Sequence, residues 1–501
     1  MKRSSIVYFL FLLSGITALV YEIVWARMLT LVFGHTIFSV SIVLAAFMTG
    51  LGIGSYYFGH VIDHIDNEIK YLDGDSFKGN LTEGSRPDNP LLIYGYIEIL
   101  IFLTCSIVSL VIFKFPDIYS WLSYFVPESV VIQNTVKAIL AFALMLIPAF
   151  LMGATLPTIS KYFISDNTKI CSQVGILYGI NTLGAALGCF LTGFFLVATF
   201  GVLQTVLSAA IINLFIGICA IRIYQESGGV LKRIRVPRLA RFSFKWEGEH
   251  NVWLAVSFVC GFTALAYEVI WSRLLVFSIA STVYSFSMML GVFLLGIMLG
   301  SLLVVTLSRS NLNLRTVLIF LQAGIGLYVI GSLYNIDQLL SAPWNGYNLQ
   351  KPIFVFSRYF LDSSALMLLP AIGLGMSFPI LVKMISSGCK HIGKETGQIY
   401  GVNTLGAIAG SLLTGFLLIP KLGTQQSLLL VATLNLLMML FLFRTGDYFT
   451  KTLRKVMTVV LAGVILIVNV GVPPDLLDRF FMRDSACQKD IRKLIYFEEG
   501  L

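Results

Sequence analysis

The stretch GITALVYE at residues 15–22 recurs as GFTALAYE at residues 261–268, with two substitutions. A second stretch, YGINTLGA at residues 178–185, returns as YGVNTLGA at residues 400–407. The same two offsets, 246 and 222 residues, relate further pairs: Trp25 and Trp271, Arg27 and Arg273, Pro148 and Pro370, Gly153 and Gly375, Pro157 and Pro379, and Lys161 and Lys383. Self-similarity at a fixed spacing indicates a duplicated structural unit. The chain therefore contains two tandem copies of one unit.

The composition excludes a water-soluble fold. Of the 501 residues, 57% are hydrophobic and only 12% are charged, whereas soluble chains are about half apolar and about a quarter charged. So few charged side chains cannot cover a soluble protein of this size, and the lipid bilayer must surround most of the chain. The net charge of +9 does not indicate a nucleic-acid partner, because the basic residues lie mostly at the ends of apolar runs.

Apolar runs long enough to cross a bilayer follow one another along the chain. A span needs about 20 predominantly apolar residues. Twelve such runs, six in each copy, lie at residues 5–33, 37–62, 91–113, 136–163, 174–199, 202–224, 252–278, 282–307, 314–335, 357–385, 397–419 and 425–443. A further run at 456–472 is a candidate thirteenth span. We therefore predict an all-α polytopic membrane protein with two tandem six-helix repeats, twelve spans in all, plus a thirteenth C-terminal span.

The even number of spans in each copy fixes how the copies are related. Six crossings return the chain to its starting side, so the two copies run parallel about an axis along the membrane normal. This is the arrangement of the two halves of major facilitator (MFS) transporters, in which the binding site lies between the halves near mid-membrane. The difference between the two offsets falls where the first copy has a polar loop at 64–89 and the second has a short turn near Arg309.

Loop charges predict the orientation and the boundaries. Residues 222–249 hold seven basic and three acidic residues, and an excess of Lys and Arg marks cytoplasmic loops. The N-terminus is then cytoplasmic too, and we predict a multi-pass protein of the cell (inner) membrane. The predicted segments are a first membrane repeat at 1–224, a basic cytoplasmic linker at 225–250, a second repeat at 251–445, an additional transmembrane segment at 446–474 and a polar tail at 475–501.

Acidic residues inside the spans are candidates for function. Glu22 and Glu268 occupy matching positions in the first helix of each copy, five residues before Arg27 and Arg273. A charge within a span costs about 2.5–3.5 kcal/mol on insertion scales, so such residues usually face a cavity or a partner. Two interpretations stay open: a substrate or proton site at the pseudo-twofold axis, or a structural ion pair with arginine reaching the interface.

Glu98 in the third span differs from its counterpart in the second copy, Gln322. Its carboxyl group either titrates during transport, balances a cationic substrate, or is a hydrogen-bonded core residue. The matched residues Asn181 and Asn403 lie in glycine-rich helices and either bond a neighbouring helix or bind a ligand. Glycines four residues apart indicate close helix packing and occur at Gly50 and Gly54, Gly184 and Gly188, Gly296 and Gly300, and Gly406 and Gly410.

These motifs resemble the membrane part of fused MFS/spermidine synthase proteins. The resemblance rests on GxxALxYExxWxRxL, the glycine-rich second helix, PAxLMGATLPxxxK and YGxNTLGAxxGxxLTGFxL, and it covers about 440 residues. In that family a soluble aminopropyltransferase domain follows. The last residues, 494–501, resemble its entry strand, but its glycine-rich nucleotide site and catalytic aspartates have no counterpart here. Gly59 to Asp63 only weakly resembles the Gly-x-x-x-Asp signature of transporters, and the second copy lacks it.

The resemblance and the buried acids together lead to two hypotheses. The first is a transporter-like protein for polyamines or another small cationic solute. The second is a non-transporting anchor or scaffold for a spermidine synthase-like domain or a separate protein of that kind. We expect no enzymatic activity from this chain alone, no cofactor and no metal. The predicted substrate-binding set is Tyr21, Glu22, Trp25, Arg27, Glu98, Asn181, Tyr267, Glu268, Trp271, Arg273 and Asn403.

Overall fold

The computed structural model describes residues 3–33, 37–76, 89–122, 127, 129–164, 166–227, 248–279, 283–310, 312–336, 339, 352–445 and short pieces between 452 and 477. This described part is helical apart from turns and short connections, and it contains no strand. Nine of its helical segments are long and apolar enough to cross a membrane. The prediction of an all-α polytopic membrane protein is confirmed.

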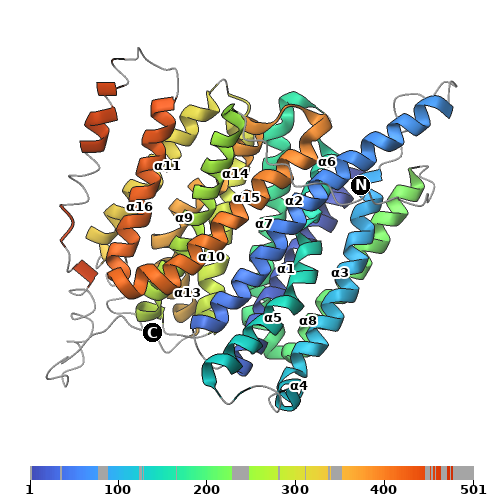
Figure 1. Cartoon of the computed structure of the whole chain (residues 1–501), viewed down its shortest axis with the longest axis horizontal. Coiled ribbons are helices and arrows are strands. Elements are labelled where there is room, and N and C mark those ends of the chain that lie inside the picture. Colours follow the sequence, from blue (N-terminus) through green and yellow to red (C-terminus); the bar gives the residue numbers. More distant parts are fainter. Residues whose placement is uncertain are drawn as a thin grey trace.

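The helices of the two copies form two bundles side by side (Figure 1). The first bundle contains α1 (Arg3–Phe33), α2 (Ile37–Ser76), α3 (Asn89–Phe113), α4 (Phe115–Leu122), α5 (Val130–Gly153), α6 (Thr155–Phe163), η2 (Asn167–Lys169), α7 (Ile170–Leu191), η3 (Thr192–Leu196) and α8 (Val197–Glu226). The second contains α9 (Gly248–Ile279), α10 (Val283–Leu307), α11 (Leu314–Tyr334), α13 (Pro352–Ser363), η5 (Ser364–Leu368), α14 (Leu369–Ile385), η6 (Cys389–His391), α15 (Ile392–Leu413), η7 (Thr414–Leu418) and α16 (Ile419–Thr445).

The solvent for the outer helix faces is lipid. Large apolar side chains project outward there, and Phe320 is 72% exposed, Ile139 63% and Ile211 62%. Inside hydrocarbon, water cannot satisfy a backbone N–H or C=O group, so a spanning segment pairs these groups within its own helix. Because the composition predicts that lipid surrounds the chain, we expect apolar outer faces on helices whose backbone groups are hydrogen-bonded internally, and the structure has both.

Two of the nine segments are too long for one crossing. Asn167–Glu226 has 60 residues and Ile392–Thr445 has 54. Continuous helices of these lengths would measure about 90 and about 80 Å, against a hydrocarbon thickness of about 30 Å. Each segment is broken at a glycine with positive φ, 76° at Gly201 and 77° at Gly423. Glycine adopts this conformation without steric cost, so the chain turns there, between successive predicted spans.

Helix α2 extends past its predicted end. The sequence predicts a polar loop from residue 64, but the helix continues to Ser76. Residues 63–73 contain neither glycine nor proline, so no strong helix breaker interrupts this stretch.

Glycines bring helices within each half into backbone contact. A methyl group added at Gly54 of α2 would lie 1.8 Å from the carbonyl oxygen of Phe150 in α5. One added at Gly300, its repeat partner in α10, would lie 2.0 Å from the carbonyl oxygen of Ile372 in α14. Equally close contacts occur at Gly184 and Gly188 against α1 and at Gly406 and Gly410 against α9. The prediction that these glycine pairs pack helices together is confirmed.

Several helix pairs join the halves, and two of them make the most extensive contacts. Helix α2 packs against α15, and α7 packs against α10 (Figure 1). A methyl group at Gly59 of α2 would lie 2.5 Å from the carbonyl oxygen of Gly393, and one at Gly397 would lie 2.4 Å from that of Ser55. These contacts lie toward the end of the bundle at which α1 begins and α2 ends, which the loop charges predict to be cytoplasmic. We call this end the predicted cytoplasmic face.

The predicted segments outside the two bundles fall mostly on residues that the structure does not describe. This applies to the linker at 225–250, the segment at 446–474 and the tail at 475–501, and these boundaries stay predictions. Described pieces near the C-terminus contact the second bundle: the Tyr334 hydroxyl donates to the carbonyl oxygen of Gly471 at 2.9 Å, and Gln425 Nε2 donates to that of Pro473 at 2.6 Å.

Replacing Gly54 with alanine tests the close approach of α2 and α5. The added methyl group would overlap backbone, so we expect destabilisation of about 1–3 kcal/mol or more, as for overpacked cores. The matched control is Gly324→Ala in α11, where an added methyl group meets nothing within 4 Å. That variant should be neutral or slightly more stable, since alanine favours helix over glycine. Thermal unfolding of the purified variants in detergent measures both, and equal midpoints would contradict the contact.

Candidate central cavity

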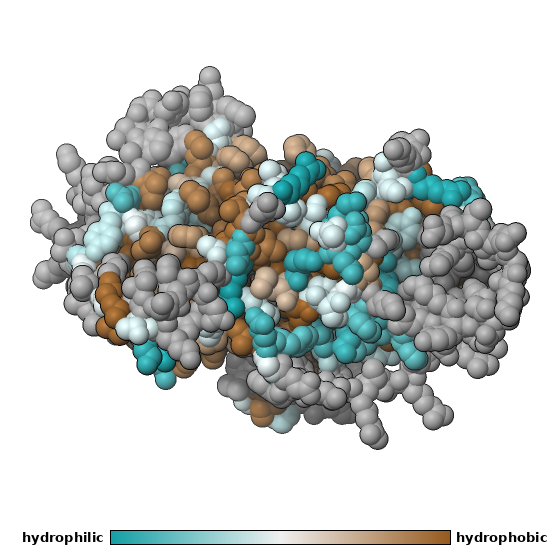
Figure 2. All heavy atoms as spheres, turned by 90° about the horizontal axis from the view of Figure 1, so that it is seen from above, coloured by the Kyte–Doolittle hydropathy of each residue, from teal (hydrophilic) through white to brown (hydrophobic). Residues whose placement is uncertain are grey.

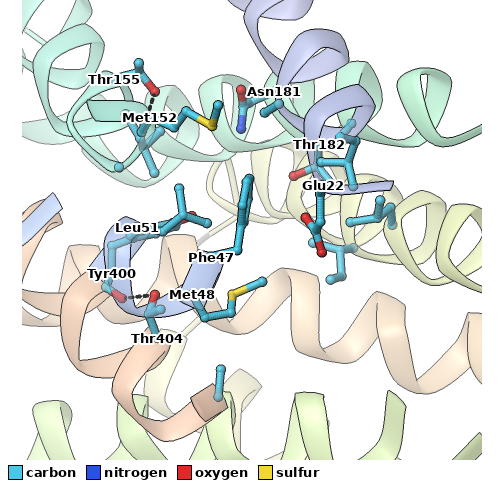
Figure 3. A pocket seen from close by; sticks show the side chains of 18 of the residues that line it. Glu22, Phe47, Met48, Leu51, Met152, Thr155, Asn181, Thr182, Tyr400 and Thr404 are labelled. Carbon is cyan, nitrogen blue, oxygen red and sulfur yellow. Dashed lines mark hydrogen bonds between the residues drawn. The ribbon is translucent and has the colours of Figure 1, made fainter. Parts of the chain in front are cut away.

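A cavity of about 200 Å³ lies between the two halves. Helices α1, α2, α3, α5, α6, α7 and α8 border it from the first half, and α9, α10 and α15 border it from the second. In Figure 3, Glu22, Phe47, Met48 and Asn181 surround the same space. The cavity therefore lies where the repeat predicts a binding site for a fold of two parallel halves.

Glu22 and Glu268 both line this cavity. Glu22 is 9% exposed, and the two carboxylates are near enough to repel one another when both are ionised. None of the described residues that line the cavity is lysine, arginine or histidine. The repeat thus places one acidic side chain from each half at the same cavity.

Amide and phenol groups add uncharged polar contacts. Asn181 and Asn403 line the cavity, and Asn403 Nδ2 donates to the carbonyl oxygen of Ser257 at 3.1 Å. Tyr178 and Tyr400 also line it, one helical turn before the two asparagines. Residues three apart share a helix face, so each half presents a tyrosine and an asparagine side by side.

The predicted aromatic residues lie behind the cavity wall, in the helix core. Tyr21 OH donates to Asn213 Oδ1 at 2.8 Å, and Trp25 Nε1 donates to Ser109 Oγ at 2.9 Å. These bonds fasten α1 to α8 and to α3. In the second half, Tyr267 stacks on Trp271, with ring centroids 4.9 Å apart. All four rings are buried and none is among the residues that line the cavity.

The two predicted arginines do not face the cavity either. Arg27 is exposed and Arg273 is half-buried, and neither is among the lining residues. Glu98 is buried one layer behind the wall, bonded to Ser14 and Asn213. Of the predicted set, the structure brings Glu22, Asn181, Glu268 and Asn403 together at one space.

Several lining residues were missed by the sequence prediction. Tyr178 and Tyr400 open the repeated stretch YGxNTLGA, so their helical spacing from the asparagines was a usable signal. Asn213 also lines the cavity, and it has a repeat partner, Asn435, at the offset of 222. An asparagine that recurs in both copies within an apolar span indicates a polar role at that position.

An ion pair closes the predicted cytoplasmic face. Lys161 Nζ of α6 lies 2.6 Å from Asp63 Oδ1 of α2, and the two side chains are 5% and 7% exposed. Both partners reach the second half: Lys161 Nζ donates to the carbonyl oxygen of Cys389 at 3.3 Å, and the N–H of Lys394 donates to Asp63 Oδ2 at 2.7 Å. Because Lys394 lies in the first turn of α15, Asp63 also meets the positive end of that helix.

Residues of the second half also bond the first half in the same region. Lys383 Nζ donates to the carbonyl oxygen of Asn167 at 2.8 Å, and the N–H of Cys389 donates to Asn167 Oδ1 at 2.8 Å. Figure 2 looks down on this face, where hydrophilic side chains gather across the middle and hydrophobic surface lies mainly to the left. Polar contacts between the two halves are therefore concentrated at this face.

The described residues offer no recognisable metal centre. No group of three or more His, Cys, Asp or Glu side chains in this part of the chain is placed to hold a metal ion. The chemistry that the cavity can perform is the reversible binding of a cation or of protons by its carboxylates.

No protein-family model matches the chain, and a comparison with curated proteins finds no significant match. Solved transporter structures do match. A bacterial homologue of the iron transporter ferroportin, in the outward-facing state with soaked iron, gives a TM-score of 0.54 at 12% identity, over 89% of this chain and 99% of that one. The MFS transporter FucP in the outward conformation gives 0.50 at 13%, over 87% and 99%. The MFS proton:xylose symporter XylE gives 0.51 at 12%, over 89% and 96%.

These likenesses show the fold. The chain is a polytopic membrane protein with the fold of major facilitator transporters. Identities this low do not carry a substrate or a mechanism from one protein to another. The resemblance to the fused spermidine synthase family stays a prediction from the sequence motifs.

Neutralising Asp63 tests the ion pair between α2 and α6. Asp63→Asn removes the carboxylate that lies 2.6 Å from the buried Lys161 ammonium, and breaking a buried pair in this way typically costs about 3–5 kcal/mol. We expect a clear loss of thermal stability, measured by unfolding in detergent. Adding Lys161→Met should recover part of the loss, because the buried charge that lost the Asp63 carboxylate is removed.

The control for this pair is Asp117→Asn. Asp117 pairs with Lys114 at 3.7 Å, with side chains 77% and 66% exposed, and exposed pairs contribute little to stability. Its unfolding midpoint should match that of the unmodified protein. If Asp63→Asn and Asp117→Asn behaved alike, the ion pair between Asp63 and Lys161 would not contribute to the stability of the protein.

Proposed function

We propose that this chain moves a small cationic solute across the membrane through the cavity between its halves. The observation that carries the proposal is that Glu22 and Glu268 face one cavity whose described lining contains no basic residue. Two buried carboxylates without a cation are costly in a membrane, and a bound cation removes that cost.

The position of the two acids suits alternating access. Glu22 belongs to the first half and Glu268 to the second, at equivalent positions of the repeat. A cation between them contacts both halves at once. In transporters built from two such halves, the halves rock around a fixed central site. Binding at this pair therefore responds directly to the relative position of the halves.

The remaining lining fits an organic cation. Tyr178 and Tyr400 present aromatic rings, which attract ammonium groups through cation–π interaction, worth about 0.5–2 kcal/mol. Asn181 and Asn403 supply amide oxygens that accept hydrogen bonds from N–H groups. Polyamines are the class to test first, because they combine ammonium groups with apolar stems and because the sequence motifs resemble a family fused to a spermidine synthase.

The alternative is a non-transporting anchor for a spermidine synthase-like domain or partner. An anchor requires an apolar exterior and a packed interior, and it has no need of two carboxylates at a central cavity. The two functions differ in two measurements. The anchor predicts co-purification with a synthase-like protein and no thermal shift with added cations, whereas the transporter predicts a shift that the acids control.

Uptake of labelled spermidine into proteoliposomes tests the transport function. We expect uptake by the unmodified protein and a loss of at least about tenfold in Glu22→Gln or Glu268→Gln, which corresponds to about 1.4 kcal/mol or more of lost interaction.

The matched control for uptake is Glu249→Gln in the first turn of α9. Glu249 has a side chain that is 71% exposed, and it lies on the same helix as Glu268. Its uptake should equal that of the unmodified protein. Uptake that is unchanged by both cavity variants would remove Glu22 and Glu268 from the mechanism.

A further inference from the structure

Glu98 of α3 lies one hydrogen bond away from the central cavity. Its side chain is fully buried. Ser14 Oγ donates to Oε1 at 2.6 Å, and Asn213 Nδ2 donates to Oε2 at 2.6 Å. Ser14 and Asn213 both line the cavity, whereas Glu98 is not among the lining residues. Both carboxylate oxygens are thus linked to the cavity through a side chain that the cavity reaches.

The second half builds a similar network around a neutral group, with Cys260 at the position of Ser14: Gln322 Nε2 donates to Cys260 Sγ at 3.6 Å and to Ser377 Oγ at 3.5 Å. Gln322 replaces the glutamate, and Asn435 Nδ2 donates to Gln322 Oε1 at 2.6 Å. Tyr267 OH donates to Asn435 Oδ1 at 2.7 Å, and Tyr21 OH makes the matching bond in the first half at 2.8 Å. An amide therefore meets the packing and hydrogen-bonding needs of this position. What the carboxyl group adds is the ability to gain and lose a proton.

Among the residues that the structure describes, Glu98 has no counter-ion. No lysine, arginine or histidine in the described part of the chain forms an ion pair with it. The titratable groups that face it are Tyr21 from α1 and Tyr94 and Cys105 from α3, while α8 presents the amide of Asn213, and α5 and α6 present none among the described residues. Tyrosine and cysteine side chains never carry positive charge.

We propose that Glu98 is a proton-binding site that exchanges its proton with water in the central cavity, a role whose link to solute movement rests on the proposed transport function. When Glu98 is a carboxylate, the Ser14 hydroxyl donates to it. A hydronium ion in the cavity gives a proton to Ser14 Oγ as the Ser14 hydroxyl passes its own proton to Glu98 Oε1. This forms the O–H bond of the acid, which then donates to Ser14 Oγ, and the new serine hydroxyl points to cavity water. Release reverses these steps and returns the proton to cavity water.

Protonation of Glu98 depends on whether a cation occupies the cavity. A cation between Glu22 and Glu268 favours, through Coulomb attraction, the ionised form of Glu98, which is bonded to two side chains that line the same cavity. By linkage, the proton on Glu98 must then weaken cation binding by the same factor. The cation and the proton therefore compete, and each tends to leave as the other enters.

Infrared difference spectroscopy of the purified protein during a pH titration tests the proton site without any solute. We expect a protonated-carboxyl band in the unmodified protein that Glu98→Gln removes. Gln322→Glu, the matched variant of the other half, should add a second band. The double variant Glu22→Gln with Glu268→Gln should retain the Glu98 band. An unchanged band in Glu98→Gln would overturn the proton site.

Exchange into heavy water tests the connection to the cavity. The Glu98 band should shift in heavy water, and it should shift more slowly in Ser14→Ala, which keeps the carboxyl group but removes the hydroxyl relay. Equal exchange in both proteins would overturn the route through Ser14. Because Glu98→Gln copies the second half, its unfolding midpoint in detergent should confirm that it folds. Absence of spermidine uptake would overturn the proposed transport of polyamines and would leave these infrared results unaffected.

Discussion

Helices in a lipid bilayer gain little from the hydrophobic effect when they associate, since lipid tails are as apolar as the side chains that replace them. Association depends instead on close packing, and in this protein glycines provide it. Gly54 and Gly300 set α2 against α5 and α10 against α14, while Gly59 and Gly397 bring α2 against α15. The first pair of contacts builds each half and the second joins the halves. The cavity exists because these backbone contacts fix where the helices lie around it.

The polar groups of the interior are arranged in two layers. The outer layer is structural: Tyr21 and Tyr267 bond Asn213 and Asn435, and so tie the first helix of each half to its last. The inner layer faces the cavity and carries Glu22 and Glu268. Ser14 and Asn213 connect the layers, because both line the cavity and both bond Glu98. Stability and chemistry therefore share side chains on the first-half side.

The sequence could predict the two-copy architecture, the spans and the meeting of Glu22 with Glu268, because all of these follow from hydrophobic run length and from the repeat offset. The sequence could not show which residues of a given helix face the cavity and which face the protein core. Tyr21 and Glu22 are adjacent in sequence, yet successive residues point about 100° apart around a helix, and only Glu22 reaches the cavity. That choice depends on which helices lie on each side of α1. The repeat marks Asn213 as a polar position, but its bond to Glu98 depends on the neighbouring α3.

The difference between Glu98 and Gln322 bears on how the molecule is built as one chain. Two identical subunits assembled around a twofold axis would carry the same residue at both positions, and either both networks or neither would hold an acid. Joining the copies in tandem frees each position to change alone. The backbone keeps its approximate symmetry, whereas only the first half has an ionisable group at this position. The two halves are consequently not interchangeable, although their helices superficially repeat.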